Sequence, residues 1–332
     1  MQKIAIVRLT AMGDIIHTLA SVVAFKQKNP HIKIDWFVEE KFASVIDNHS
    51  LIDRVIPINL HSLKSELTLS KISKIYKELK LHSNYDVVVD MQGLIKSAIV
   101  SRILSKRVYG LDSNSAREGI ASLLYTKRCS VDCSGIAPLR FASLLSCALD
   151  TSITKDELLA ALPILEHKSY SELDRYFDKK SIVIVVGAST PNKTYPKELW
   201  VELIERLDRY NILLIAGSKL EIESAKYIAS NTNATLLPPC DLDRLKYIIS
   251  KSNLLIGGDT GPSHMAWALR VPSLILFGAT PVSMMMQTDI NIALKPNYTP
   301  HPCKFDKNNR SIDTIKPELI ALKAQRLLDA TT

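Results

Sequence analysis

The segment KIAIVRLTAMGDIIHTL, residues 3–19, decides how the first half of the chain folds. Its short apolar run KIAIV predicts a buried strand, and the stretch that begins with IIHTL has the apolar spacing of a helix. The turn between them holds one glycine, Gly13, and one acidic residue, Asp14. A turn that binds nucleotide phosphates at this place is usually rich in glycine. The carboxylate of Asp14 therefore indicates a function other than phosphate binding at the tip of the first strand.

The same alternation of apolar runs and amphipathic stretches continues along the first half. Apolar runs that end at turns predict strands over 4–9, 32–38, 54–58 and 86–90. Helical spacing predicts helices over 14–27, 42–48, 69–80 and 93–104. Continuous buried strands separated by helices are typical of a parallel sheet with helices on both faces.

The pattern starts again after residue 180. Strands are predicted over 181–187, 211–217, 254–259 and 272–279. Helices are predicted over 197–210, 220–230, 241–252 and 262–269, and a last helix at 317–330 has no strand after it. The stretch 150–180 holds no strong strand and is interpreted as the linker. The sequence thus predicts an α/β fold with two doubly wound domains, whose ligands bind at the carboxyl ends of the strands.

The composition is that of an ordinary globular protein. At 332 residues the chain is long enough for two domains, and its hydrophobic and charged fractions of 46% and 23% are typical values. No apolar stretch approaches the roughly 20 residues that a membrane-spanning helix needs. The first residues lack the basic, apolar and small-residue regions of a signal peptide. We therefore expect a cytoplasmic protein.

The net charge of +8 is concentrated in the first half, where residues 1–150 hold 20 Lys and Arg against 14 Asp and Glu. This excess favours an anionic partner, with a merely solvated basic surface as the alternative. The five cysteines are odd in number and include no Cys-x-x-Cys pair. We therefore expect reduced structural thiols instead of a disulfide framework or a zinc site.

The segment IGGDTGPSHMAWAL, residues 256–269, joins the end of a predicted strand to the start of a helix. Its glycines let a ligand approach the main chain closely, and the N–H groups that open the helix suit a phosphate. Those groups belong to Thr260, Gly261 and Ser263, and His264 lies in the same turn. Asp259 either takes part in this ligand site or caps the helix.

Two further loops of the second half carry candidates for nucleotide binding. In the loop 187–200, Ser189 and Thr190 suit phosphate contacts, and Lys193 suits the charge that develops on a pyrophosphate leaving group. The alternative for Lys193 is a solvated loop lysine. Glu221, in the first turn of the next predicted helix, suits the hydroxyls of a ribose, because a carboxylate accepts two hydrogen bonds. Its alternative role is to complement the helix dipole.

The first half provides the candidates for catalysis and for acceptor binding. If the second half binds the nucleotide, Asp14 faces it across a cleft and can take the proton of an acceptor hydroxyl. Its alternative role is a helix cap. Polar and basic candidates for an anionic acceptor are Lys64, Gln92, Lys96 and Arg117. Four lysines on one amphipathic helix, either a solvated face or a contact for an anionic lipid surface, are Lys71, Lys74, Lys77 and Lys80.

Several of these segments together resemble the bacterial lipopolysaccharide heptosyltransferases, over most of the chain and in the same order. They are MGDIIHTL at 12–19, YDVVVDMQGLIKSA at 85–98, NSAREGIASLLY at 114–125 and GGDTGPSHMAWAL at 257–269. The resemblance implies the GT-B architecture, in which two Rossmann-like domains face each other across a cleft. It implies an acceptor-binding domain at 1–160, an ADP-heptose-binding domain at 161–312, and a C-terminal helix at 313–332 that packs back on the first domain.

The resemblance also implies the reaction, in which L-glycero-D-manno-heptose passes from ADP-heptose to a Kdo residue of Kdo-lipid A with inversion. Asp14 would be the base, and Lys193 would act at the donor phosphates. The donor would be held by Ser189, Thr190, Lys193, Glu221, Asp259, Thr260, Gly261 and His264. The acceptor would be held by Lys64, Gln92, Lys96 and Arg117.

The family needs no metal, and no Asp-x-Asp motif stands at a plausible strand end here, so we expect neither a metal nor another cofactor. The resemblance implies a monomer at the cytoplasmic face of the inner membrane, attached peripherally, with no nucleic-acid partner. One alternative is an enzyme that adds the second heptose, although the matches at 12–19 and 90–98 favour the first. The other is a nucleotide-binding module or oxidoreductase, but the turn RLTAMGD lacks the G-x-G-x-x-G pattern.

Overall fold

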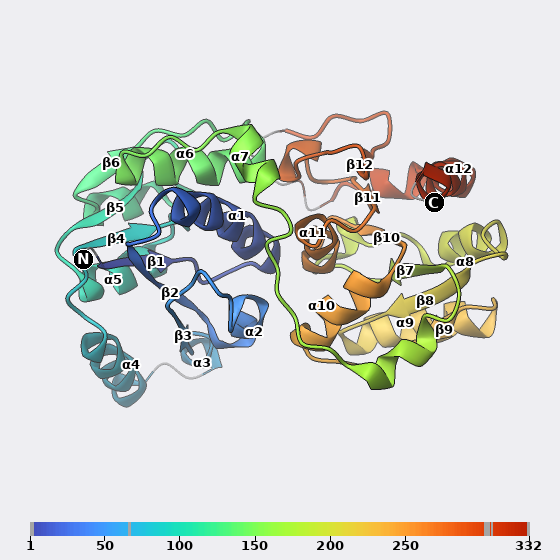
Figure 1. Ribbon diagram of the computed structural model, residues 1–332, viewed down its shortest axis with the longest axis horizontal. Coiled ribbons are helices and arrows are strands. Elements are labelled where there is room, and N and C mark those ends of the chain that lie inside the picture. The colour runs from blue at the N-terminus through green and yellow to red at the C-terminus, as the bar shows by residue number, and fades with distance from the viewer. Residues whose placement is uncertain (1–2, 66–67, 302–305, 307, 331–332) are drawn as a thin grey trace. The chain divides into compact units, whose positions relative to one another are not determined.

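The computed structural model of the protein describes residues 3–65, 68–301, 306 and 308–330, except for the side chains of residues 64 and 65 (Figure 1). It divides into two compact units, Met1–Glu166 and His167–Thr332. The division lies a few residues beyond the expected boundary at 160 and falls within the predicted linker. Each unit holds one parallel sheet of six strands. The predicted α/β fold with two doubly wound halves is confirmed.

In the first unit the strand order is β3-β2-β1-β4-β5-β6, so that β1 lies between β2 and β4 and the loops after β1 and β4 are neighbours. The strands are β1 (Lys3–Val7), β2 (Lys33–Glu39), β3 (Arg54–Ile58), β4 (Val87–Asp90), β5 (Val108–Leu111) and β6 (Lys127–Cys129). The helices are α1 (Met12–Lys28), α2 (Ala43–Ile46), α3 (Ser62–Ser65), α4 (Leu69–Leu81), α5 (Ile95–Leu104), α6 (Ala137–Leu149) and α7 (Lys155–Ala160), with short 3₁₀ turns η1 (Glu40–Phe42) and η2 (Gly119–Leu124).

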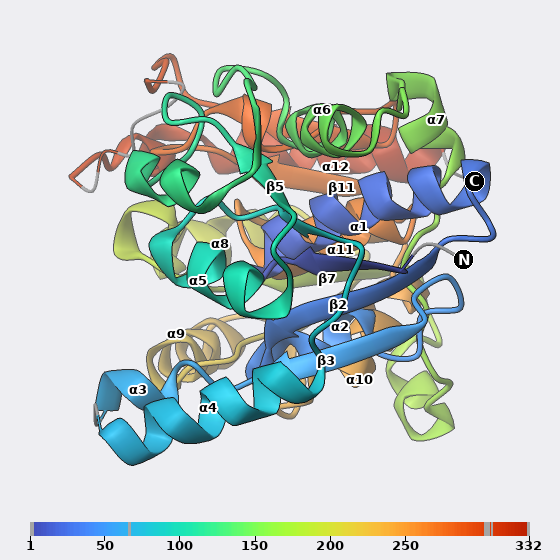
Figure 2. The ribbon, with the colours of Figure 1, turned by 90° about the vertical axis from the view of Figure 1, so that its left-hand side faces the viewer.

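The central strands of this sheet are apolar on both faces because helices cover both. Ile4, Ile6 and Val88 are completely buried. Helices α1 and α6 pack together on one face, whereas α4, α5 and η2 contribute to the core on the other (Figures 1 and 2). A parallel sheet covered in this way leaves its carboxyl edge as the place where loops can form a site.

The second unit repeats the architecture with the strand order β12-β11-β10-β7-β8-β9. The strands are β7 (Ser181–Val185), β8 (Asn211–Ile215), β9 (Thr235–Leu236), β10 (Leu254–Gly258), β11 (Ser273–Leu276) and β12 (Asn291–Leu294). The helices are α8 (Lys197–Glu205), α9 (Lys219–Ser230), α10 (Leu242–Lys251), α11 (Gly261–Ala268) and α12 (Pro317–Ala330), with η3 (Ser171–Tyr176), η4 (Pro191–Lys193), η5 (Val282–Met284) and η6 (Ser311–Thr314). Here the loops after β7 and β10 are neighbours, because these two strands pair.

The last helix, α12, packs within the second unit. Its buried side chains Ile320, Ala324 and Leu328 belong to the core that also holds Trp200 of α8 and Ile256 of β10. The helix therefore completes the core of the second unit, and its expected packing on the first domain stays a prediction. An amphipathic helix must bury its apolar side somewhere, but its sequence does not say against which sheet.

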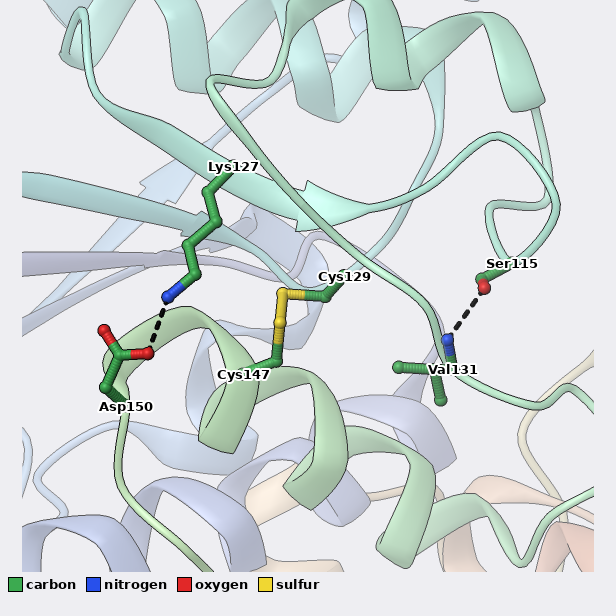
Figure 3. Close-up of a disulfide and its surroundings, with 6 residues drawn as sticks. All are labelled: Ser115, Lys127, Cys129, Val131, Cys147 and Asp150. Atoms are coloured by element: carbon green, nitrogen blue, oxygen red, sulfur yellow. Dashed lines mark hydrogen bonds and ion pairs between the residues drawn. A yellow bond between two sulfur atoms is a disulfide. The ribbon is translucent and has the colours of Figure 1, made fainter.

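One expectation about the cysteines needs correction. Cys129 at the end of β6 and Cys147 in α6 form a disulfide, with 6.0 Å between their Cα atoms (Figure 3). The expectation of reduced thiols is wrong for this pair. Helix α6 packs on β5 and β6, which brings the two residues within the range that a disulfide spans. Since the contact joins two elements of the tertiary structure, the spacing of the cysteines along the chain did not reveal it.

The four strands predicted in each half are present, and the structure adds β5, β6, β9 and β12. These additional strands are at most four residues long and lie toward the margins of their sheets. Short marginal strands need fewer apolar residues and are therefore harder to detect by hydropathy. Within the residues that the structure describes, none of the helices is long and apolar enough to cross a lipid bilayer.

Candidate active site

In the second unit, the carboxylate of Asp259 is the centre of a buried polar cluster. It lies directly after β10, and Lys193 Nζ is 2.6 Å from its Oδ2 atom. The hydroxyl of Thr280 donates to the same oxygen at 2.8 Å, and His264 Nε2 lies 3.0 Å from Oδ1. The segments that follow β7, β10 and β11 therefore meet at this carboxylate, at the carboxyl edge of the sheet.

The local sequence explains why this convergence is possible. A Cβ atom at Gly258 would lie 2.6 Å from the carbonyl oxygen of Lys193, so only glycine lets the Lys193 loop pass so close. Thr260 is the N-cap of α11, with extended backbone angles, and Pro262 stands in its first turn. Ser263 Oγ donates to the carbonyl oxygen of Gly258 at 2.7 Å and holds the turn. Asp259 does not cap the helix, which was its alternative role, because its side chain turns to Lys193, His264 and Thr280.

The electrostatics of Asp259 follow from these contacts. Burial by itself would raise the pKa of the carboxyl group, but the hydrogen bond with His264 and the positive charge of Lys193 outweigh burial and hold this pKa well below its usual range. The lowered pKa favours the ionised carboxylate, which pairs with the ammonium group of Lys193. Lys193 also reaches the main-chain oxygen of Asp259 at 3.4 Å, so it is not the solvated loop lysine of the alternative interpretation.

Ser189 and Thr190, the other two candidates for phosphate binding, lie in the loop before Lys193 and differ in their exposure. Ser189 is exposed, and Thr190 is half-buried and precedes η4. The carbonyl oxygen of Thr190 accepts from the N–H of Lys193 at 3.1 Å, which closes the turn. Within the described part of the chain, Thr190 Oγ1 is buried and has no hydrogen-bond partner. A buried hydroxyl of this kind is expected to bond to something else, such as a ligand or a water molecule.

Glu221 lies at the same edge and forms a capping box with Ser218. Its Oε2 atom accepts from the main-chain N–H groups of Gly217 and Ser218 at 2.7 and 2.8 Å, and Ser218 Oγ accepts from the N–H of Glu221 at 3.3 Å. The carboxyl group also lies against Gly187, where a Cβ atom would be only 2.5 Å from Oε1. Glu221 therefore has the alternative role of an acid in the first turn of the helix. Its contact with a ribose stays a prediction.

In the first unit, Asp14 opens α1 and forms an ion pair with Arg8, which follows β1. Arg8 is buried, donates through Nη1 to the carbonyl oxygen of Met91 at 2.6 Å, and has its guanidinium group 4.9 Å from the ring centre of Phe141. The N-cap position of α1 is Ala11, and no side-chain hydrogen bond caps the helix. Asp14 is therefore held by Arg8 and does not serve as a cap.

A second arginine, Arg140 of α6, contributes to the field around Asp14. Burial lowers the pKa of the Arg140 guanidinium group, the charge of Asp14 partly offsets this effect, and the charge of Arg8 reinforces it. The Nε atoms of Arg8 and Arg140 are buried without a hydrogen-bond partner among the described residues. The sequence analysis missed both arginines. For Arg8, its position just after the first strand was a usable signal, whereas Arg140 comes from a helix far along the chain.

The four acceptor candidates lie on different elements of the first unit. Gln92 is buried and joins the loops after β1 and β4, since its Oε1 accepts from the N–H of Leu9 at 2.9 Å and its Nε2 donates to Thr10 Oγ1 at 3.0 Å. This supports a structural role. Lys96 is half-buried in the first turn of α5, and Arg117 is exposed between β5 and η2. Lys64 lies in α3, but its side chain is outside the described residues.

Comparison with known proteins shows the family to which this chain belongs. The family model of glycosyltransferase family 9 (heptosyltransferase) matches residues 72–308. Lipopolysaccharide heptosyltransferase 1 of Campylobacter coli is 34% identical over 95% of this chain and 96% of its own length. The enzyme of the same name from Escherichia coli K12 is 32% identical, over 84% of this chain and 88% of its own.

The structure of E. coli heptosyltransferase WaaC with ADP-2-deoxy-2-fluoro heptose has the same fold, with a TM-score of 0.79 at 24% identity, covering 98% of this chain and 99% of that one. The architecture is therefore the GT-B fold of nucleotide-sugar glycosyltransferases. The chain belongs to glycosyltransferase family 9, the heptosyltransferases. The resemblance seen in the sequence is confirmed.

Proposed function

We propose that this heptosyltransferase moves L-glycero-D-manno-heptose from ADP-heptose to a Kdo residue of Kdo-lipid A, with inversion, in the synthesis of the lipopolysaccharide inner core. The observation that carries the donor part is the buried cluster of Asp259, Lys193, His264 and Thr280 at the carboxyl edge of the second sheet. Two relatives with more than 30% identity are named lipopolysaccharide heptosyltransferase 1, which supports the first heptose over the second.

The donor cluster supplies a positive charge for the pyrophosphate of an ADP-sugar and a negative charge for the sugar hydroxyls. The three N–H donors of the Lys193 ammonium group can serve the carboxylate of Asp259 and a phosphate oxygen together. The main-chain N–H groups that open α11, at Thr260 and Gly261, add a positive potential for the pyrophosphate. The ionised carboxylate of Asp259 accepts hydrogen bonds from sugar hydroxyls. Glu221 binds the ribose through the carboxyl oxygen that lies against Gly187.

The acceptor half supplies the base. In a single displacement, the acceptor oxygen attacks the anomeric carbon, its proton passes to Asp14, and the bond to the ADP oxygen breaks. The ion pair with Arg8 holds the carboxylate of Asp14 in place until the acceptor hydroxyl arrives. Negative charge grows on the departing ADP, where Lys193 and the start of α11 stabilise it. This scheme uses neither a metal ion nor a bound cofactor.

The acceptor is borne by a lipid, so we propose that the protein works as a monomer attached peripherally to the cytoplasmic face of the inner membrane, without a nucleic-acid partner. Lys64, Lys96 and Arg117 remain the proposed contacts for acceptor anions. For Gln92 we propose an indirect contribution, since its amide already holds the loops beside Asp14.

Mass spectrometry of the acceptor after incubation with ADP-heptose and the purified protein tests the assignment. We expect Kdo-lipid A to gain one heptose. A gain only on an acceptor that already carries one heptose would move the assignment to the second transfer. Binding of NAD with no transfer to either acceptor would contradict the proposal and favour an oxidoreductase. The Lys193→Ala variant serves as the control, because it should lose both donor affinity and rate while it keeps the fold.

A further inference from the structure

Three consecutive helical elements of the first unit share an unusual property. Helices α4 and α5 and the turn η2 lie next to one another and bury one side in the core against the sheet (Figure 2). Each also leaves large apolar side chains on its outer side. Among the described residues of this unit, every exposed large apolar side chain comes from these three elements: Leu69, Ile72, Tyr76, Leu81, Ile95, Ile99, Ile120 and Leu123.

Helix α4 has two apolar sides and not one. Ile75 and Leu79 point to the core, whereas Leu69, Ile72 and Tyr76 follow one another at intervals of three and four residues on a neighbouring, exposed side. The same row continues with Lys80, whose Nζ atom lies 5.7 Å from the ring centre of Tyr76. An apolar row that ends in a lysine is the pattern of a helix that lies at a membrane interface.

Helix α5 and η2 extend this row into a surface. Ile95 and Ile99 lie four residues apart on α5, and Ile120 and Leu123 lie three apart in η2. The two elements are tied together, because the N–H of Ile95 donates to Glu118 Oε2 at 2.7 Å, directly before η2. We call this continuous surface of α4, α5 and η2 the outer helical face.

The charges around the outer helical face are mainly positive. Exposed cationic side chains on its elements and their borders are Lys74, Lys77, Lys80, Arg102 and Arg117. Exposed acids there are Glu78 and Glu118, and the carboxylate of Glu118 already accepts from the main chain of α5. Isoleucines and leucines ringed by lysine and arginine complement a surface that has negative headgroups outside and hydrocarbon beneath.

We propose that the outer helical face binds an anionic phospholipid bilayer, with Leu69, Ile72 and Tyr76 entering the headgroup region and the surrounding Lys and Arg contacting lipid phosphates. The inference rests on the proposed function in one respect, since a lipid-borne acceptor gives such binding a use. All residues involved belong to the first unit, and none of those chosen for substitution lies in the candidate active site.

Sedimentation with vesicles tests this proposal directly. The probes are vesicles of phosphatidylethanolamine with phosphatidylglycerol, and neutral vesicles of phosphatidylcholine, both without any sugar acceptor. We expect the protein to bind the anionic vesicles and to release them as salt rises. The double change Ile72→Ser and Tyr76→Ser should lower the partition coefficient about tenfold. The charge reversal Lys77→Glu with Lys80→Glu should lower it by at least as much.

Helix α12 offers a matched control. Ile72 and Tyr76 are 42% and 47% exposed, and Leu319 and Leu322 are 42% and 46% exposed. The double change Leu319→Ser and Leu322→Ser removes equally exposed apolar groups from the second unit and should leave vesicle binding within about twofold of the unmodified protein. Thermal unfolding of all variants checks that they are folded.

Three results would overturn the proposal. They are an unmodified protein that does not bind anionic vesicles, α4 variants that bind as well as the unmodified protein, and a control variant that loses as much binding as they do. The first result would assign the face to solvent or to a protein partner. Transfer of heptose to a deacylated, water-soluble acceptor is measured separately and should be unchanged in the α4 variants. Failure of that transfer in the unmodified protein would contradict the proposed function without affecting the vesicle result.

Discussion

Asp259 and Asp14 each lie in a segment that follows a central strand of its own sheet. The two carboxylates differ in how far they are buried and in how many side chains contact them. The side chain of Asp259, after β10, is 4% exposed and is engaged by Lys193, His264 and Thr280. The side chain of Asp14, after β1, is 28% exposed and has Arg8 as its ion-pair partner. The carboxyl edge of each sheet thus has one such aspartate, buried in the second unit and accessible in the first.

This difference in burial limits what each carboxylate can do. A buried carboxylate with three partners and a lowered pKa keeps its charge and its position, so it suits the binding of a ligand. A carboxylate that reaches solvent can be approached by a substrate hydroxyl and can accept its proton. The comparison therefore agrees with the proposed functions, which are ligand binding at the edge of the second sheet and proton transfer at the edge of the first. Substitutions of these carboxylates test whether their roles differ in this way.

The largest effect is expected from Asp14→Asn. The amide cannot accept the proton of the acceptor hydroxyl, so turnover should fall about a hundredfold or more. The affinity for ADP should change little, because Asp14 belongs to the other unit from the donor cluster. Rates of ADP release and calorimetric titration with ADP measure the two quantities. Near-normal turnover in this variant would remove Asp14 from the base role.

The next effect is expected from Asp259→Asn. The amide has nearly the same shape, but it leaves the ammonium group of Lys193 without its buried counter-charge, and the free energy of unfolding should fall by about 3 kcal/mol. Urea unfolding measures it. Glu318→Gln, which removes the partner of Arg206 in an exposed ion pair of the same unit, is the matched control and should cost less than about 1 kcal/mol. Equal losses in the two variants would show that burial does not distinguish Asp259.

The stabilising effect of Asp259 should also depend on pH. Folding lowers the pKa of this carboxyl group from its ordinary value of about 4, so its ionised form stabilises the folded state at neutral pH. Below that ordinary value the unfolded chain takes up a proton first, and the stabilisation declines as the pH falls toward the folded-state pKa. The difference in unfolding free energy between the unmodified protein and Asp259→Asn should therefore narrow from about pH 5 to about pH 3. A constant difference over that range would contradict the lowered pKa.

The smallest effect concerns Glu221, a third carboxylate, which lies at the same edge as Asp259. Glu221→Ala and Ser218→Ala each remove part of the capping box, and each should cost about 1 kcal/mol of stability. If Glu221 also binds the ribose, only its own variant should lose affinity for ADP. Thermal unfolding and ADP titration of the two variants separate the roles. Equal ADP affinities would leave Glu221 as a helix cap alone.

Sequence reasoning found most of the elements at these edges because they are local. The apolar run 3–7 and the turn with Asp14 stand next to each other in the chain, and so do β10, Asp259 and His264. The partners that decide the chemistry are not local. Lys193 and Asp259 are 66 positions apart, and Gly258 lets them meet only because it has no side chain. Gln92 looked like an acceptor contact, but a loop 82 positions away uses its amide.

The amino-acid sequence was enough to predict the two parallel sheets, the residue ranges of their main strands, and the carboxyl ends of the strands as the place of the candidate site. It could do so because buried strands and amphipathic helices are encoded by the spacing of apolar residues within each segment. Only the tertiary structure decided that α12 completes the second unit, that Cys129 meets Cys147, that Arg8 holds Asp14, and that α4 exposes a second apolar side. Spacing shows that a side chain is apolar or charged, but which surface or partner it meets depends on how the elements pack.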